Sequence, residues 1–356
     1  DSNQRTEALD ISAIGVQMAD GVGKGLVLKD VISGVKREGS YEMHAGKEKC
    51  IHYEANEYTY VFLDSLENEV RMVFRLYEDG VAFRYEIPHL KETRIEDELT
   101  TYRIPEGRKR WMQSFDMSYE RFFPESTTGK ERHNHWGYPA LIQMGDHVWT
   151  LISEAGIEKM HCASSLKNEK EVSDFKVTLG NHDNMLSGDW FSPWRVAMIG
   201  TLSDVVESTL VTDVSPENRI GDISWIQPGA VSWIYWAYNH GSKDYQIVKK
   251  YIDMAVELSL PYVLIDAEWD EMSNGGSIED AILYAKERHV KPLIWYNSST
   301  AWLKEWGAPG PHHRLNDPDK REKEFQWLED RGVAGVKIDF FAGDHQETMN
   351  FCIDLL

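Results

Sequence analysis

Hydrophobic and polar residues alternate along much of the first two thirds of the chain, which is the period of a β-strand that buries one face. The alternation predicts strands over Tyr58–Leu63, Val70–Tyr77, Val81–Ile87, His147–Glu154, Phe175–Leu179 and Arg195–Gly200. Glu78, Asp79 and Gly80 separate two of these strands, and such a turn sequence predicts a β-hairpin. Because long helical periodicity is scarce in this part, we expect residues 1–225 to form an antiparallel β-sandwich domain.

After Pro228 the pattern changes to apolar strands that alternate with amphipathic helices. The expected strands are Val231–Tyr238, Tyr262–Ala267, Pro292–Tyr296 and Gly335–Phe341, and the expected helices are Tyr245–Leu258, Ser277–His289 and Asp319–Arg331. Ser277 is a favourable N-cap, with Asp280 three residues later. Four such β/α units predict the first half of a (β/α)8 TIM-type barrel over residues 226–356. An open, doubly wound sheet is the alternative, although no glycine-rich phosphate-binding motif follows any of these strands.

The composition limits the classes of partner. The 356 residues contain 38 Lys and Arg against 59 Asp and Glu, a formal charge of −21 that argues against nucleic acid or an anionic membrane surface. No apolar run is long enough to span a membrane. Cys50, Cys162 and Cys352 are isolated and form neither a disulfide framework nor a zinc motif. The 13 Trp and 16 Tyr offer flat faces that suit sugar rings, although large β-rich domains also bury many aromatic residues.

Polar residues follow each of the four expected parallel strands, where barrel enzymes carry their functional side chains. These residues are Asn239 and His240, then Asp266, Glu268 and Asp270, then Asn297, and finally Asp339. The three acidic residues after the second strand alternate with apolar ones, so they would share a face and bring up to three carboxylates together. Such a group suits acid–base chemistry, sugar hydroxyls or a metal ion. It equally suits a polar barrel end that Lys or Arg partners neutralise.

Lys337 and Asp339 share one face of the last expected strand. A neighbouring cation lowers the pKa of a carboxyl group and keeps it ionised, so Asp339 could act as a nucleophile. A structural ion pair is the alternative. Trp residues near the strand ends favour a sugar over a phosphate ester as substrate; they are Trp233, Trp236, Trp269, Trp295, Trp302 and Trp306. Asp344, five residues after Asp339, is expected to cap the final helix, with a hydrogen bond to a ligand as the alternative.

Several segments in this order resemble glycoside hydrolase family 97, which contains α-glucosidases and α-galactosidases of polysaccharide-degrading bacteria. The segments are IQPGAVSW (226–233), YVLIDAEWD (262–270), PLIWYNS (292–298) and GVKIDFFAGDHQ (335–346), together with SYERFF (118–123) and SPWRVAMIG (192–200). The resemblance covers essentially the whole chain. It implies an N-terminal β-super-sandwich followed by a (β/α)8 barrel.

The resemblance also implies roles for individual residues. Asp339 matches the nucleophile that the retaining branch of the family carries at the end of the fourth barrel strand. Glu120 matches one ligand of a calcium ion, which takes six to eight oxygens in all. The candidate substrate-binding residues are Asp266, Glu268, Asn239, Asn297, Trp295 and Lys337. The family's acid/base Glu and its other calcium ligands have no counterpart here, so we expect the polypeptide to continue beyond Leu356.

The expected function is that of a retaining exo-α-glycosidase acting on an oligosaccharide or glycoside. The first expectation is an α-galactosidase, and an α-glucosidase or a β-L-arabinopyranosidase of the same family is the alternative. A non-catalytic carbohydrate-binding protein on the same scaffold is a further alternative, as is a metal-dependent hydrolase that holds its ion with Asp266, Glu268 and Asp339. The family association implies a secreted or periplasmic bacterial protein.

Overall fold

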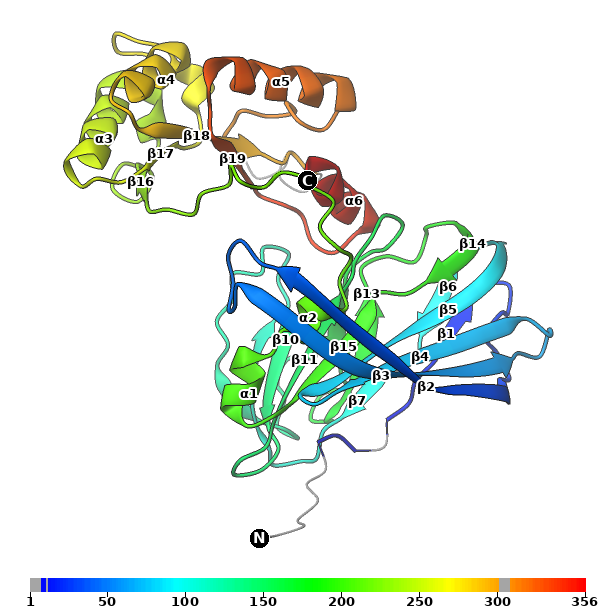
Figure 1. Cartoon of the computed structure of the whole chain (residues 1–356). Coiled ribbons are helices and arrows are strands. Elements are labelled where there is room, and N and C mark those ends of the chain that lie inside the picture. Colours follow the sequence, from blue (N-terminus) through cyan, green and yellow to red (C-terminus); the bar gives the residue numbers. More distant parts are fainter. Residues whose placement is uncertain (1–7, 11, 301–307) are drawn as a thin grey trace. The chain divides into compact units, whose positions relative to one another are not determined.

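The computed structural model describes residues 8–10, 12–300 and 308–356. The chain forms two compact units, Ser224–Ala342 and a larger unit that combines Asp1–Ile223 with Gly343–Leu356 (Figure 1). The last helix, α6 (Gln346–Leu355), therefore belongs to the unit built from the N-terminal residues. The sequence pattern predicts a single boundary between residues 225 and 226. The compact units group Gly343–Leu356 with the N-terminal residues.

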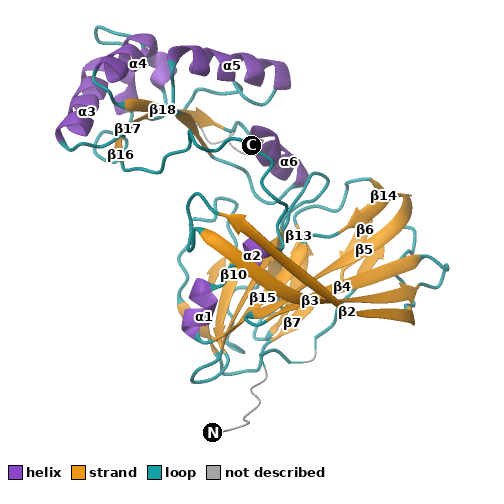
Figure 2. Cartoon of the chain, viewed as in Figure 1, coloured by secondary structure: helices purple, strands orange, loops and turns teal. Residues whose placement is uncertain are grey.

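The larger unit is rich in antiparallel strands (Figure 2). Its strands are β1 (Val16–Met18), β2 (Val27–Glu42), β3 (Cys50–Leu63), β4 (Glu69–Tyr77), β5 (Gly80–Thr93), β6 (Ile95–Glu98), β7 (Thr101–Arg103), β8 (Lys109–Ser114), β9 (Glu125–Thr127), β10 (His135–Gln143), β11 (Trp149–Ala155), β12 (Ser164–Lys167), β13 (Asp174–Leu179), β14 (Leu186–Phe191) and β15 (Trp194–Gly200). Two short helices, α1 (Leu202–Glu207) and α2 (Leu210–Asp213), follow β15. Every strand that the alternation predicted in this part lies within or overlaps one of these strands, and the β4–β5 hairpin is confirmed.

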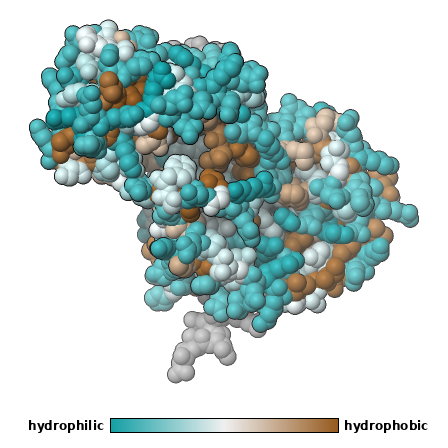
Figure 3. Space-filling model, turned by 45° about the horizontal axis from the view of Figure 1, so that its top comes forward, coloured by the Kyte–Doolittle hydropathy of each residue, from teal (hydrophilic) through white to brown (hydrophobic). Residues whose placement is uncertain are grey.

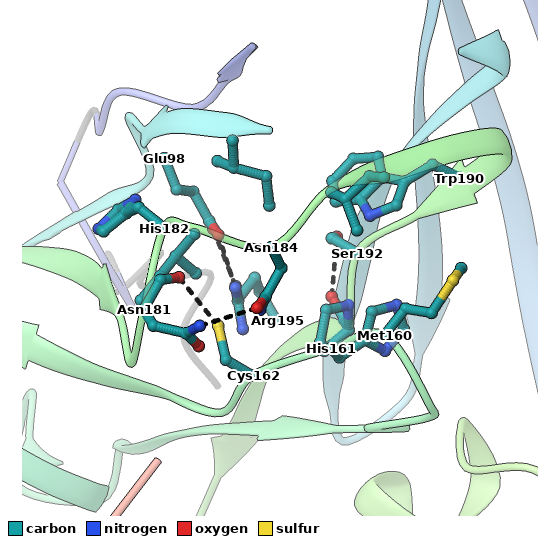
Figure 4. A pocket seen from close by; sticks show the side chains of 14 residues that line it. Glu98, Met160, His161, Cys162, Asn181, His182, Asn184, Trp190, Ser192 and Arg195 are labelled. Atoms are coloured by element: carbon teal, nitrogen blue, oxygen red, sulfur yellow. Dashed lines mark hydrogen bonds and ion pairs between the residues drawn. The ribbon is translucent and has the colours of Figure 1, made fainter. Parts of the chain in front are cut away.

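The interior of this unit is largely apolar but also holds buried charged side chains, among them those around Arg195. Arg195 is 1% exposed and donates to Glu98 Oε1 at 2.8 Å and to Glu154 Oε2 at 2.6 Å. On the face shown in Figure 3, hydrophilic residues predominate, with smaller hydrophobic areas between them. Figure 4 shows Arg195 and Glu98 beside a cavity of about 20 Å³, which has room for about one water molecule. A cavity of that size cannot hold a sugar.

The second unit contains four parallel strands in the order in which they occur along the chain. The strands are β16 (Val231–Trp233), β17 (Tyr262–Ile265), β18 (Lys291–Asn297) and β19 (Gly335–Asp339), and helices α3 (Tyr245–Glu257), α4 (Ile278–Glu287) and α5 (Pro318–Arg331) connect them. Ser277 caps α4 in a capping box with Asp280, as predicted. The unit is thus a partial α/β domain, and closure into a complete barrel stays a prediction. None of the described helices is long and apolar enough to cross a membrane.

Two predictions of local structure are wrong. The expected strand Val231–Tyr238 ends at Trp233, because the chain then turns and the Tyr238 N–H donates to the carbonyl of Ile234 at 3.1 Å. Asp344 does not cap the last helix. His345 occupies the N-cap position of α6, while Asp344 accepts hydrogen bonds from the Tyr119 hydroxyl.

Candidate functional site

The carboxyl ends of the parallel strands bring one lysine and two carboxylates together. Asp266 directly follows β17, and Asp339 is the last residue of β19. Lys337 Nζ lies 2.9 Å from Asp339 Oδ2 and 3.8 Å from Asp266 Oδ2. The predicted pairing of Lys337 with Asp339 is therefore confirmed, and Asp266 joins it because parallel strands end at the same edge of a sheet.

Two indole groups hold these carboxylates in position. Trp233 Nε1 donates to Asp266 Oδ2 at 2.6 Å, and Trp295 Nε1 donates to Asp339 Oδ2 at 3.1 Å. Lys337 Nζ also lies 4.8 Å from the centroid of the Trp233 ring, a cation–π contact. Trp295 is only 1% exposed, so in this structure its indole orients Asp339 and offers no open face to a sugar. Trp302 and Trp306 lie outside the described residues.

Asp339 combines partial exposure with a stabilised negative charge. Burial by itself raises the pKa of this carboxyl, but the hydrogen bonds from Lys337, Trp295 and the Phe340 N–H outweigh it and hold the pKa below its ordinary value. The side chain remains 38% exposed. Asp266 is 4% exposed, and its Oδ1 accepts from the Ala267 N–H at 2.8 Å. Asp339 is thus the carboxylate of the pair that a ligand can reach.

Glu268 belongs to a different ionic group. Its carboxylate pairs with His240 Nδ1 and, at 3.0 Å, with Lys243 Nζ. Burial raises the pKa of Glu268, and the hydrogen bonds to His240 and Lys243 outweigh that effect and lower it. The expectation that Asp266, Glu268 and Asp270 share one face is wrong, because β17 already ends at Ile265 and a left-handed residue and a 3₁₀ turn follow.

The two predicted asparagines have different environments. Asn297, 1% exposed, donates from Nδ2 to the Pro309 carbonyl at 2.8 Å and accepts from the Ser299 N–H at Oδ1 at 2.8 Å. Its amide therefore holds the loop that follows β18. Asn239 lies in the exposed turn after β16. Contact of either residue with a substrate stays a prediction.

A left-handed backbone conformation occurs in the loop after each of the four strands. The residues with positive φ are His240 (63°), Glu268 (67°), Ser299 (53°) and Phe340 (62°). Side-chain-bearing residues seldom adopt this conformation, and those that do gather at functional sites. Nine other described non-glycine residues also have positive φ, so this conformation does not by itself mark the site. The sequence carries no signal for it, because none of the four residues is glycine.

Two family models match the chain. The model described as "Glycosyl-hydrolase 97 N-terminal" matches residues 2–216, and the model described as "Glycoside hydrolase 97" matches residues 228–356. The chain belongs to glycoside hydrolase family 97. The resemblance drawn from the sequence is thereby confirmed.

Three similar proteins show what share of each relative's length this chain covers. A Streptomyces bingchenggensis protein named "Probable retaining alpha-galactosidase" is 27% identical over 329 residues, which are 89% of this chain and 49% of the relative. The structure "Crystal structure of beta-arabinopyranosidase" is 28% identical with a TM-score of 0.88, over 98% of this chain and 59% of that one. A family 97 enzyme from Pseudoalteromonas sp. strain K8 in complex with panose shares the fold, at 18% identity and a TM-score of 0.83, over 99% of this chain and 59% of that one. This chain spans about half the length of the curated relative.

The calcium ion that family 97 membership led us to expect has one candidate ligand here. Glu120 is exposed in the loop between β8 and β9. Within the described ranges, no group of three or more His, Cys, Asp or Glu side chains could hold a metal ion. Because calcium needs six to eight oxygens, Glu120 with its described neighbours does not form a complete site.

Proposed function

We propose that this chain is part of a retaining exo-α-glycosidase that releases terminal sugars, with α-galactose as the first expected substrate. The observation that carries the proposal is the ionised, partly exposed carboxylate of Asp339, held by Lys337 and Trp295 at the end of β19. The name of the Streptomyces relative supports the retaining mechanism and the sugar. Because the chain is also similar to a β-arabinopyranosidase, a β-arabinopyranoside is the alternative substrate.

In the proposed first step, Asp339 attacks the anomeric carbon, and the bond between that carbon and the glycosidic oxygen breaks. The departing oxygen takes a proton from a second carboxyl group, for which we assign no residue in this chain. In the second step, water gives a proton back to that group and displaces Asp339 from the sugar, which restores the free carboxylate of Asp339 and the protonated form of the second carboxyl group. The two inversions give net retention of configuration.

Lys337 has a role in both states of Asp339. Its ammonium pairs with the free carboxylate of Asp339 and so keeps it ionised for attack. When Asp339 becomes a neutral ester, the charge of Lys337 still faces Asp266, 3.8 Å away. The lysine therefore does not become an uncompensated cation in the intermediate, which limits the free-energy change that the protein must absorb.

Activity of the full-length protein and of its Asp339→Gly variant tests this proposal. We expect the wild type to hydrolyse aryl α-galactosides faster than aryl α-glucosides or β-L-arabinopyranosides, and the variant to lose at least 10³-fold in kcat, an order-of-magnitude value for a missing nucleophile. Azide should partly restore cleavage and yield the glycosyl azide of inverted configuration. Unchanged hydrolysis by the variant would exclude Asp339 as the nucleophile. Sugar binding without any turnover by the wild type would support the non-catalytic alternative.

We keep calcium and a secreted or periplasmic location as parts of the same proposal. Both rest on family 97 membership. When bound, the calcium ion would supply electrostatic stabilisation near the second carboxyl group, and Glu120 would contribute one of its oxygen ligands.

A further inference from the structure

The turn after β16 presents two aromatic rings to solvent. Trp236 is 82% exposed and Tyr235 is 39% exposed. An indole held in water forgoes the large apolar stabilisation that burial gives this side chain. A ring exposed to this extent in a turn beside a functional edge therefore calls for a partner that covers it in use.

Both rings are in contact with the carboxylate cluster through Trp233. The Trp233 and Tyr235 rings stack with centroids 6.3 Å apart at 19°, and the Trp236 ring meets Trp233 edge-on at 5.7 Å. Trp233 in turn bonds to Asp266 and lies beside Lys337. The aromatic surface formed by Tyr235 and Trp236 is thus continuous with the site through Trp233.

We propose that Trp236, backed by Trp233 and Tyr235, stacks against the sugar on the leaving-group side of the scissile bond. This inference rests on the proposed function and deepens it, because it assigns the surface that binds the leaving-group sugar. The sugar that Asp339 attacks must lie against the charged groups that bind its hydroxyls. The next ring of an oligosaccharide then lies further out, where the described edge offers an apolar, flat surface.

The chemistry of the surface favours a neutral sugar over other partners. A formal charge of −21 repels anionic partners, and a flat indole suits the apolar face of a pyranose. Stacking on an aromatic ring adds little directional specificity, so the surface should accept different acceptor sugars. Another segment of polypeptide covering Trp236 is the competing occupant, and the experiment below separates the two.

The decisive measurement compares two donors that carry the same glycosyl group. In a glycosyl fluoride the leaving group is a single atom, whereas in a disaccharide it is a second sugar ring. For Trp236→Ala in the full-length protein, we expect kcat/KM on the disaccharide to fall about 3- to 10-fold, the scale of one aromatic contact, and kcat/KM on the fluoride to stay the same. Trp236→Phe keeps a flat ring and should recover part of the loss.

Tyr238→Ala is the matched control, because Tyr238 lies in the same turn but packs edge-on against Tyr251 at 6.1 Å. It should leave the ratio of the two kcat/KM values unchanged. An equal fall on both donors, or no fall on either, would overturn the proposal for Trp236. A lower melting temperature of Trp236→Ala with an unchanged ratio would instead assign the surface to polypeptide packing.

A failure of this inference can be distinguished from a failure of the proposed function. If the wild type hydrolyses neither donor, the glycosidase proposal fails. Binding of sugar to the aromatic surface formed by Tyr235 and Trp236 is then tested by calorimetric titration with the disaccharide. Weaker binding by Trp236→Ala than by Tyr238→Ala would support stacking, and equal binding by both would exclude it.

Discussion

At the scale of single residues, the ammonium of Lys337 is the group on which the ionisation of Asp339 depends. It lies between two carboxylates of which one is buried and one is 38% exposed. Burial opposes ionisation of Asp339, and the hydrogen bonds from Lys337, Trp295 and the Phe340 N–H together outweigh it, with Lys337 making the largest of these contributions. The ion pair of Lys337 and Asp339 therefore influences the pH range in which the protein can act.

Replacing Lys337 by Met should move the acidic limb of activity to higher pH. Without the cation, only the hydrogen bonds from Trp295 and the Phe340 N–H oppose the effect of burial, so the pKa of Asp339 rises. We expect kcat/KM on the acidic limb to fall about 10-fold for each unit by which the pKa rises, measured as a full pH–rate profile of the full-length protein. Lys320→Met, on the exposed side of α5, is the control and should leave the profile unchanged. A uniform loss without a shift of the limb would contradict this role of the lysine.

At the scale of elements, the pair formed by buried Asp344 and the Tyr119 hydroxyl fixes the start of α6. The Tyr119 hydroxyl lies 2.7 and 2.8 Å from the two oxygens of Asp344, and the Ala163 N–H donates to the Asp344 carbonyl at 2.9 Å. The Gln346 N–H, at the first turn of the helix, finds its acceptor in Asn181 Oδ1 at 3.1 Å. Residues far apart in the chain thus replace the local cap that the sequence predicts.

This pair should make stability depend on pH. Burial, helped by repulsion from Glu154, raises the pKa of Asp344 to about 6 against an ordinary 3.8, even though the Tyr119 hydrogen bond opposes the rise. The folded state therefore binds the proton more tightly than the unfolded state. The stabilisation that protonation provides is complete below pH 3.8 and is lost as the pH rises through about 6.

Asp344→Asn removes that titration. Relative to the wild type, we expect the variant to gain stability from pH 4.5 to pH 7.5, by up to about 3 kcal/mol on the scale of 1.36 kcal/mol per pKa unit. Melting temperatures across this range measure the gain. Asp146→Asn, at an exposed residue between β10 and β11, is the control and should not reproduce the gain of Asp344→Asn. A constant difference for Asp344→Asn would contradict the argument.

At the scale of the whole molecule, the charge of −21 favours cations, and calcium is the cation that we propose. Saturating calcium should raise the melting temperature of the full-length protein, because a ligand at 100 times its Kd adds about 2.7 kcal/mol. Glu120→Gln should weaken calcium binding in a calorimetric titration. Glu125→Gln changes an exposed carboxylate on the neighbouring strand β9 and is the control. Equal affinities of both variants for calcium would exclude Glu120 as a ligand.

The sequence alone predicted those elements whose side chains alternate between a buried and an exposed face. Strand β4, with Val70 and Met72 buried, is such a case. Strand β2 gave no such signal, because nearly all of its residues are exposed and its pairing depends on backbone hydrogen bonds to β3. The apolar and aromatic residues after Trp233 led to the opposite error, a strand predicted too long. These residues form an exposed turn but have the composition of a buried strand.

The sequence by itself determined the alternation of strands and helices after Pro228. It also determined the pairing of Lys337 with Asp339, because residues two apart in a strand share a face. Only the tertiary structure decided that Asp266 and Trp233 join that pair while Glu268 turns to His240 and Lys243. These contacts depend on where each strand ends and on the register of parallel pairing. Both are set by long-range packing, which no local pattern of residues records.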